Sequence, residues 1–166
     1  MIGGSARAGP CRRVRAADWE RHVAGYVLAL DMTARDHQAR AKAGGLPWTL
    51  GKCWDSFAPL SPLVPRRLVR DPHALELTLA VDGAERQRGR TALMLHRIPE
   101  LIEFASSVMT LERGDVLLTG TPEGVGPVAG GNLITAQLRR APSESGEPGA
   151  LLAELVVPVV DEEGRA

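Results

Sequence analysis

The chain has 166 residues, of which 44% are apolar and 24% are charged, proportions that are ordinary for a globular protein. This length predicts a single domain over residues 1–166. The 20 basic side chains balance the 20 acidic ones, so there is no basic field of the kind that binds nucleic acid. No apolar run approaches the ~20 residues that cross a bilayer, so we expect no membrane partner. Two cysteines, Cys11 and Cys53, are too few for a disulfide framework and favour a reduced, intracellular setting.

The first half of the chain predicts one buried strand between two short helices. Residues 25–31 form a short apolar run that is rich in β-formers and ends in a carboxylate, which is typical of a buried strand. Residues 16–23 can form two helical turns before it. Residues 33–43 are polar, contain good helix formers and end at Gly44-Gly45, so they predict a helix that stops there.

The second half predicts a β-hairpin, a helix and three further strands. Residues 75–81 alternate between apolar and other side chains, Asp82-Gly83 supplies a preferred two-residue turn, and residues 85–91 return. Apolar residues recur on one helical face over residues 98–109. Strands are expected over residues 115–119, 133–138 and 151–160, with a polar loop over residues 141–149. Several strands and few helices, without a regular βαβ rhythm, predict an α+β fold.

Three polar residues lie at or just after the end of the first predicted strand. Asp31 ends the strand, where a carboxylate is held rigidly and can face a cavity, a position that suits a ligand of a hard divalent cation. If residues 33–38 are helical, Arg35 and Gln38 share a face, and Arg35 can bind an anionic substrate with its planar fork. On periodicity alone, an N-capping Asp31 and a solvated Arg35 are the simpler interpretation.

Lys52 lies in an aromatic, turn-rich stretch, residues 45–59, which contains two of the three tryptophans. A partly buried lysine can position a water or an anionic intermediate. The alternative is a loop whose aromatic side chains fill the core while Lys52 lies on the surface. No paired base is evident for the neighbouring Cys53, so we do not expect a thiol nucleophile.

A segment rich in glycine and proline, residues 118–127, follows the strand expected over residues 115–119. Its backbone can come close to a ligand, and Thr121 adds a hydroxyl next to Gly120. The segment lacks the Gly-Lys-Ser/Thr ending of a P-loop and the glycine spacing of a dinucleotide-binding fold. Taken alone, it predicts a tight turn that can serve as a binding loop. The four histidines have no metal-ligand spacing, and no Gly-x-Ser-x-Gly elbow of a serine hydrolase occurs.

Taken together, these segments resemble the fumarylacetoacetate hydrolase family, in the family's order along nearly the whole chain. The most specific are DMTARD, GLPW and LTGTPEGVGP, at residues 31–36, 45–48 and 118–127. As a set they look most like the acylpyruvate hydrolase and oxaloacetate decarboxylase-like branch. The resemblance implies a mixed β-roll with a few short helices, a homodimer, and a location in the cytoplasm, or in the mitochondrion if the source is a eukaryote.

The resemblance also implies roles for individual residues. The family holds Mg²⁺ or Mn²⁺ with three carboxylates, and Asp31 matches one of these metal ligands. Arg35, Gln38 and Lys52 would be catalytic residues that contact the substrate or the metal-bound water. The substrate would be a small-molecule 2-oxo acid. Its carboxylate or carbonyl group would be bound at the Gly120–Thr121 turn and by Arg35.

The family's other two metal ligands form a Glu-x-Glu pair on an earlier strand, which is followed by a turn containing glycine. Residues 1–4, Met-Ile-Gly-Gly, look like that turn, so we expect the pair upstream of Met1 and a domain that is incomplete at its N-terminus. A strand would then be missing from the roll. The strand over residues 25–31 would be left with an unpaired edge, which favours aggregation.

The resemblance leaves three functions open. The leading one is a metal-dependent hydrolase that cleaves the C–C bond of an acylpyruvate, or of a related 2-oxo acid or diacid, through a metal-stabilised enolate. The second is an isomerase or hydratase of hydroxymuconate-type diacids, which uses the same metal and enolate. The third is a catalytically silent, truncated subunit, because one carboxylate is too few for a tight Mg²⁺ site.

Overall fold

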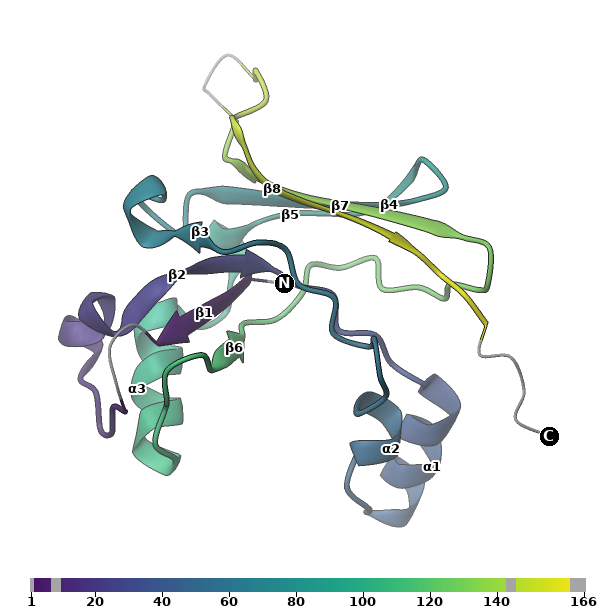
Figure 1. The fold of residues 1–166 in the computed structure, drawn as a ribbon, viewed down its shortest axis with the longest axis horizontal. Helices are drawn as coiled ribbons and strands as arrows, with labels where there is room; N and C mark the ends of the chain where they lie inside the picture. Colours follow the sequence, from purple (N-terminus) through teal and green to yellow (C-terminus); the bar gives the residue numbers. More distant parts are fainter. Residues whose placement is uncertain (1, 7–9, 143–145, 162–166) are drawn as a thin grey trace.

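The structure, a computed structural model, describes residues 2–6, 10–142 and 146–161 of the chain. Its strands form two four-stranded sheets, in the orders β3-β2-β1-β6 and β5-β4-β7-β8, and the paired strands are antiparallel. Figure 1 shows the second sheet lying over the first, with short helices around them. The expected α+β class with a few short helices is confirmed.

The first sheet is built around β2 (Val23–Leu28), a largely buried strand that pairs with β1 (Ile2–Ala6) on one side and β3 (Val64–Pro65) on the other. β6 (Val116–Leu118) pairs with the far side of β1. Two expectations are therefore wrong. Residues 2–4 belong to a strand rather than a turn, with Met1 outside the described residues, and β2 is an inner strand rather than an unpaired edge.

The second sheet contains the predicted hairpin and both predicted C-terminal strands. At the hairpin turn Asp82 (φ 51°) and Gly83 (φ 78°) both adopt the left-handed conformation that a tight two-residue turn requires. The Asp82 carboxylate accepts hydrogen bonds from the Leu133 N–H and from Asn132 Nδ2, each at 2.7 Å, and so ties the turn to the next strand. The four strands are β4 (Leu75–Val81), β5 (Ala84–Arg90), β7 (Leu133–Arg140) and β8 (Leu151–Pro158).

The helices are short. Residues 16–22 form the expected helical turns as a 3-10 helix, and α2, which contains Lys52, lies in the stretch for which a surface loop was one alternative. α1 ends as predicted at the glycine pair, because Gly45 (φ 62°) adopts the left-handed conformation and its N–H caps the last turn. The helices are η1 (Ala16–His22), α1 (Arg35–Gly44), α2 (Thr49–Lys52), η2 (Arg66–Leu68), η3 (Thr91–Leu93) and α3 (Ile98–Val108).

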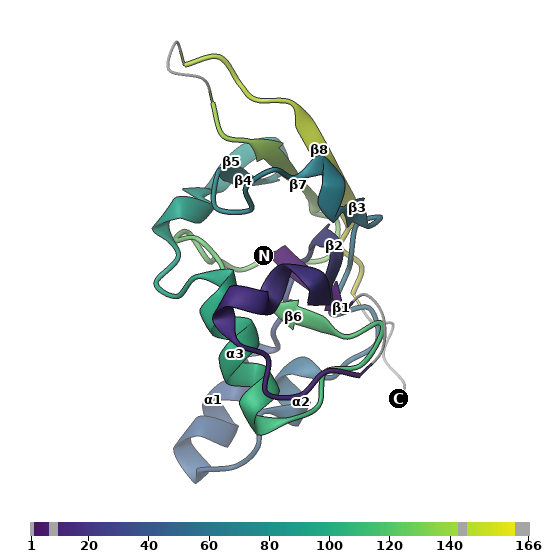
Figure 2. The same ribbon diagram turned by 90° about the vertical axis from the view of Figure 1, so that its left-hand side faces the viewer.

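The core joins the two sheets to α3. Tyr26 and Leu28 of β2 are at most 2% exposed and belong to one apolar cluster with Leu75 of β4 and Leu138 of β7. α3 packs beside η1, as Figure 2 shows, and its predicted apolar face is buried through Ile98 and Ile102, in that same cluster. Among the described residues, no helix is both long and apolar enough to cross a bilayer.

Candidate active site

α1, α2 and the loop between them, residues 35–52, form a helical arm that stands away from the two sheets (Figure 1). The chain enters and leaves the arm through two segments that run side by side as a stem. The stem carries Asp31 and Thr33, so these side chains are held at the base of the arm. Its backbone hydrogen bonds are Leu30 N–H to Pro59 O at 3.0 Å, Met32 N–H to Phe57 O at 2.9 Å and Ala34 N–H to Gly51 O at 3.0 Å.

Lys52 connects the arm to the stem. Its ammonium nitrogen lies 2.6 Å from Oδ2 of Asp31 and donates a hydrogen bond to Oγ1 of Thr33 at 2.8 Å. The side chains of Lys52 and Asp31 are 29% and 33% exposed, so the pair is half-buried but open to a solute. Asp31 lies three residues beyond the end of β2 rather than at the strand's last position, and the stem instead fixes it.

Arg35 and Gln38 share a face in the first turn of α1, as predicted. Arg35 Nη1 donates a hydrogen bond to Gln38 Oε1 at 2.9 Å, which orients the guanidinium. α2 packs closely against Gln38, because a Cβ on Gly51 would lie 3.2 Å from the Cβ of Gln38. This close approach places Lys52, the residue after Gly51, near the helix that carries Arg35 and Gln38.

The two tryptophans of this stretch lie on the arm or just after it and do not fill the core. Trp48 is 49% exposed and Trp54 is 40% exposed. Trp54 donates a hydrogen bond from Nε1 to the carbonyl of Leu50 at 2.6 Å, and its ring centroid lies 5.7 Å from that of His37. The alternative in which these aromatic side chains fill the core is therefore wrong. Their contacts brace the arm itself.

The Gly120–Thr121 turn is held from β5. Gln87 Nε2 donates to Thr121 Oγ1 at 3.0 Å and to the carbonyl oxygens of Pro122 and Glu123 at 2.8 and 3.3 Å. Gly89 permits this contact, because a Cβ there would lie 2.7 Å from the Pro122 side chain. Gln87 was not predicted as a site residue. The signal was that residues 81–87, VDGAERQ, also resemble the family.

The predicted site residues thus fall into two groups, one at the base of the arm and one beside β5. The first group brings Lys52, Asp31, Arg35 and Gln38 onto neighbouring segments. The contacts of Thr121 given above are with β5 and not with the arm.

A divalent cation needs several oxygen ligands, and Asp31 offers one carboxylate that is already paired with Lys52. Nowhere in residues 2–6, 10–142 and 146–161 do three His, Cys, Asp or Glu side chains gather to hold a metal, so these residues alone do not fit a complete site.

Comparison with curated proteins finds oxaloacetate enzymes. The chain is 58% identical over 115 residues to the mitochondrial oxaloacetate tautomerase FAHD1 of Arabidopsis thaliana, covering 69% of this chain and 52% of that protein. It is 51% identical over 113 residues to the mitochondrial oxaloacetate decarboxylase of Dictyostelium discoideum, covering 68% and 52%. The chain therefore spans about half the length of these relatives.

Solved structures share the fold. A fumarylpyruvate hydrolase from Pseudomonas aeruginosa, in complex with Mn²⁺ and pyruvate, is 35% identical with a TM-score of 0.85, covering 97% of this chain and 64% of that one. A 5-carboxymethyl-2-hydroxymuconate delta-isomerase from Mycobacterium smegmatis is 38% identical with a TM-score of 0.80, covering 98% and 57%. The family model described as fumarylacetoacetate (FAA) hydrolase C-terminal matches residues 4–155. The chain belongs to the fumarylacetoacetate hydrolase family of enzymes.

Proposed function

We propose that this chain supplies part of the active site of an enzyme that acts on a small 2-oxo acid through its enolate. The observation that carries the proposal is the Lys52 ammonium group, which contacts both the Asp31 carboxylate and the Thr33 hydroxyl at the base of the arm. A positive charge fixed in a partly buried position stabilises the negative charge that develops on an enolate oxygen. Oxaloacetate is the favoured substrate, because the relatives at 58% and 51% identity are named as oxaloacetate enzymes.

Tautomerisation, decarboxylation and acylpyruvate hydrolysis all pass through the enolate of a 2-oxo acid. In tautomerisation, a proton leaves C3 of the keto acid and the enolate oxygen is protonated, or the reverse. In decarboxylation, the bond between C3 and the distal carboxylate breaks, its electron pair stays in the pyruvate enolate, CO₂ leaves, and C3 takes up a proton. In acylpyruvate hydrolysis, water adds to the far carbonyl, and the electron pair of the broken C–C bond passes into the pyruvate enolate.

The chain's own side chains have distinct tasks in this proposal. Lys52 faces the developing oxyanion, and Arg35 binds the substrate carboxylate with its guanidinium fork. Gln38 orients Arg35 through their 2.9 Å hydrogen bond. The Gly120–Thr121 turn offers a backbone N–H and a hydroxyl to a second polar group of the substrate, and Gln87 keeps that turn in place.

We further propose that Asp31 is one ligand of Mg²⁺ or Mn²⁺ in the complete enzyme. Its carboxylate is one-third exposed, and a solved member of the family was crystallised with Mn²⁺ and pyruvate. Among the described residues, no three His, Cys, Asp or Glu side chains gather to hold a metal, so the partner ligands of Asp31 are expected from another segment of the enzyme.

Hydrolysis of an acylpyruvate is the second candidate reaction. The fumarylpyruvate hydrolase with a TM-score of 0.85 favours it, since pyruvate is bound in that structure. Isomerisation of a hydroxymuconate-type diacid is the remaining alternative and is favoured by the isomerase with a TM-score of 0.80. Each of these reactions passes through an enolate of a 2-oxo acid, so they differ in the substrate groups beyond the 2-oxo acid.

We also propose that the enzyme is a homodimer in the cytoplasm or the mitochondrion. Large apolar side chains are exposed close to one another in sequence, including Leu93 at 77% and Leu95 at 96%, and a partner subunit would cover such a surface. The mitochondrial names of the two oxaloacetate relatives support the second compartment. Light scattering of the purified protein tests the dimer.

The function is tested with two proteins and a panel of substrates. One protein is the 166-residue chain. The other is a chimaera in which the segment of the Arabidopsis tautomerase that precedes the matched region is joined to the N-terminus of the chain. Both are assayed with Mg²⁺ or Mn²⁺ for oxaloacetate tautomerisation, oxaloacetate decarboxylation, acylpyruvate cleavage and hydroxymuconate isomerisation.

The proposal expects the chimaera to act on oxaloacetate faster than on the other substrates. Turnover of an acylpyruvate alone would favour the second candidate, and turnover of a hydroxymuconate-type diacid alone would favour the isomerase. A folded chimaera that acts on none of them would contradict the proposal and favour a catalytically silent subunit.

A further inference from the structure

The hydroxyl group of Thr33 is hydrogen-bonded in a defined direction. An ammonium group donates hydrogen bonds and accepts none, so Thr33 Oγ1 accepts the 2.8 Å bond from Lys52 Nζ. The hydroxyl proton is then donated to the main-chain carbonyl of Asp31, whose oxygen lies 3.2 Å from Oγ1. The carboxylate of Asp31 lies 2.6 Å from the same Nζ atom. Lys52, Thr33 and Asp31 therefore form a closed ring of contacts on the stem.

Two acceptors on the stem fix the direction of the third N–H bond of Lys52. The ammonium group has three N–H bonds in a tetrahedral arrangement, and the contacts with Asp31 and Thr33 occupy two of them. With one acceptor alone, the group can still turn about the line that joins the two bonded atoms. With two acceptors, the remaining N–H bond has one direction. The Lys52 side chain is 29% exposed, so a solute can approach the ammonium group.

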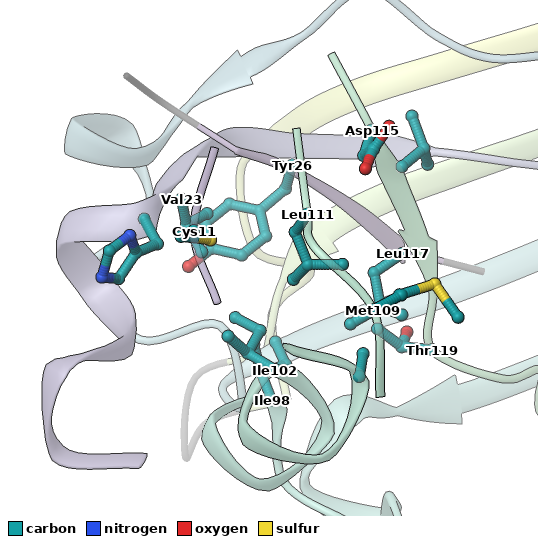
Figure 3. A pocket seen from close by; sticks show the side chains of 13 residues that line it. Cys11, Val23, Tyr26, Ile98, Ile102, Met109, Leu111, Asp115, Leu117 and Thr119 are labelled. Carbon is teal, nitrogen blue, oxygen red and sulfur yellow. The ribbon is translucent and has the colours of Figure 1, made fainter. Parts of the chain in front are cut away.

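The Lys52 group lies apart from the apolar cavity of about 380 Å³ beside α3, which Figure 3 shows. The described residues that line that cavity come from η1, β2, α3, β6 and the segments next to these elements. Lys52, Asp31 and Thr33 belong to the arm and its stem instead. A solute that contacts Lys52 therefore binds at the base of the arm and not in this cavity.

The stem does not depend on the Thr33 hydroxyl for its backbone pairing. Its hydrogen bonds are donated by the N–H groups of Leu30, Met32 and Ala34. Asp31 and Thr33 alternate with these residues, so their side chains lie on the same side of an extended segment, where both reach Nζ of Lys52. Removing the Thr33 hydroxyl therefore loosens Lys52 and leaves the backbone hydrogen bonds of the stem in place.

We propose that Thr33 is a positioning residue, whose hydroxyl aims the third N–H bond of Lys52 at the enolate oxygen of the 2-oxo acid. This role rests on the proposed function, in which Lys52 faces the developing oxyanion, and it adds the residue that sets the direction of that donor. A donor that is already in place stabilises developing charge without reorganisation, and a small misplacement of such a group lowers the rate. Thr33 therefore acts on kcat through Lys52 and does not touch the substrate.

Two substitutions of Thr33 separate its hydroxyl from its shape. Thr33→Val keeps the β-branched shape and removes the hydroxyl, whereas Thr33→Ser keeps the hydroxyl. In the chimaera, Thr33→Val should lower kcat for oxaloacetate by about 10-fold and change KM by less than about 2-fold, because the affected contact forms in the transition state. Thr33→Ser should keep kcat within about 3-fold of the wild type. Thr78→Val, at a half-buried threonine of β4, is the control and should change neither constant.

A double substitution shows whether Thr33 acts through Lys52. In a Lys52→Met background there is no ammonium group to orient, so adding Thr33→Val should lower kcat by less than about 2-fold. A purely structural role of Thr33 would lower kcat by the same factor with and without the lysine. Thermal melts of the Thr33 variants should stay within about 4 °C of the wild type, because the backbone pairing of the stem is kept.

The anchoring of Lys52 is also measured without turnover. Lys42 and Lys52 are the two lysines of the 166-residue chain, so two lysine ammonium signals are expected in nitrogen–proton correlation spectra. The Lys52 ammonium protons should exchange with water at least about 3-fold more slowly than those of the exposed Lys42, the scale of one hydrogen bond. Thr33→Val should raise the exchange rate of Lys52, and Thr33→Ser should not.

The inference is overturned if a folded Thr33→Val chimaera keeps a near wild-type kcat while Lys52→Met loses activity, an outcome that leaves the proposed function intact. It is equally overturned if Thr33→Val lowers kcat by the same factor in both backgrounds, or if the exchange rate of the Lys52 ammonium protons is the same in Thr33→Val as in the wild type. If a folded Lys52→Met variant keeps the wild-type rate, the proposed role of Lys52 fails, and the role of Thr33 fails with it.

Discussion

The Nζ atom of Lys52 lies 2.6 Å from Oδ2 of Asp31, and this contact joins the last residue of α2 to the stem below the helical arm. Thr33 is the second acceptor of the same ammonium group, at 2.8 Å. The Lys52 ammonium group therefore links α2 to the stem segment that carries Asp31 and Thr33. A metal bound to Asp31 would compete with Lys52 for the carboxylate, so the pair couples the proposed metal ligand to the proposed catalytic cation.

The first prediction concerns metal binding by Asp31. Calorimetric titration of the chimaera with Mn²⁺ should show binding that Asp31→Asn weakens by at least about 10-fold. Removing a direct ligand should lower the metal affinity at least as much as removing a residue that hydrogen-bonds to a ligand. Asp36→Asn is the matched control, since Asp36 lies on the exposed face of α1 with Arg40. The 166-residue chain should bind Mn²⁺ weakly. Micromolar binding by this chain that survives Asp31→Asn would refute the assignment.

The second prediction concerns the support of the Gly120–Thr121 turn. Gln87→Leu removes the donor that holds Thr121 and the two following carbonyl groups. We expect KM of the chimaera for oxaloacetate to rise by about 10-fold, with a smaller change in kcat, because substrate positioning is lost. Gln137→Leu on β7 is the control and should leave KM unchanged. Equal effects of the two substitutions would remove the turn from the site.

The third prediction concerns the contact between α3 and the segment before η1. Ser106 is 0% exposed, and its Oγ accepts a hydrogen bond from the Val14 N–H at 2.9 Å. Ser106→Ala leaves that buried N–H unpaired and should lower the free energy of unfolding by about 1–3 kcal/mol. The exposed neighbour Ser107 donates a hydrogen bond to the carbonyl of Phe104, one turn back in the same helix, so Ser107→Ala should cost less than about 0.5 kcal/mol. Urea melts of the two variants give the comparison.

The fourth prediction concerns pH. The side chain of His73 is 12% exposed, and its Nε2 accepts a hydrogen bond from the Ile98 N–H, at the first turn of α3. Burial, and then the charge of Arg97, lower the pKa of His73 below its ordinary value of 6.5. The unfolded chain therefore takes up the proton more readily than the folded one. The stability contributed by neutral His73 is present above pH 6.5 and is lost as the pH falls through the lower pKa of the folded state.

Urea melts at several pH values between about 7.5 and 5 measure this loss. His73→Gln should flatten the pH dependence in this window, because the titrating group is gone. His96→Gln is the control, since the His96 side chain is 74% exposed and lies near the same helix. If the free energy of unfolding of His73→Gln depends on pH as steeply as that of the wild type, the loss of stability comes from other titrating groups.

Local chemistry made part of the fold predictable. The Asp82-Gly83 turn was predicted because both positions tolerate the left-handed conformation, and the end of α1 was predicted because Gly45 does so as well. β3 consists of Val64 and Pro65 alone and is defined by its pairing with β2, so no periodicity could reveal it. β1 was missed for the same reason, since its glycines favour a turn until β2 and β6 pair with it.

Part of the candidate site was also predictable from the sequence, and part was not. Arg35 and Gln38 lie three residues apart on one helix, so their contact followed from helical spacing. The contacts of Lys52 with Asp31, and of Gln87 with Thr121, join residues on separate elements, and spacing says nothing about such pairs.

The most direct test of the enolate proposal is the turnover of oxaloacetate by the chimaera with either of two lysines replaced. Lys52→Met removes the ammonium group that contacts Asp31 and Thr33, whereas Lys42→Met removes an exposed lysine from α1 of the same arm. We predict that Lys52→Met lowers kcat by at least about 10²-fold, the scale of losing one positioned catalytic group. Lys42→Met should keep the wild-type rate, and both variants should melt as the wild type does. A folded Lys52→Met variant with a near wild-type kcat would contradict the account.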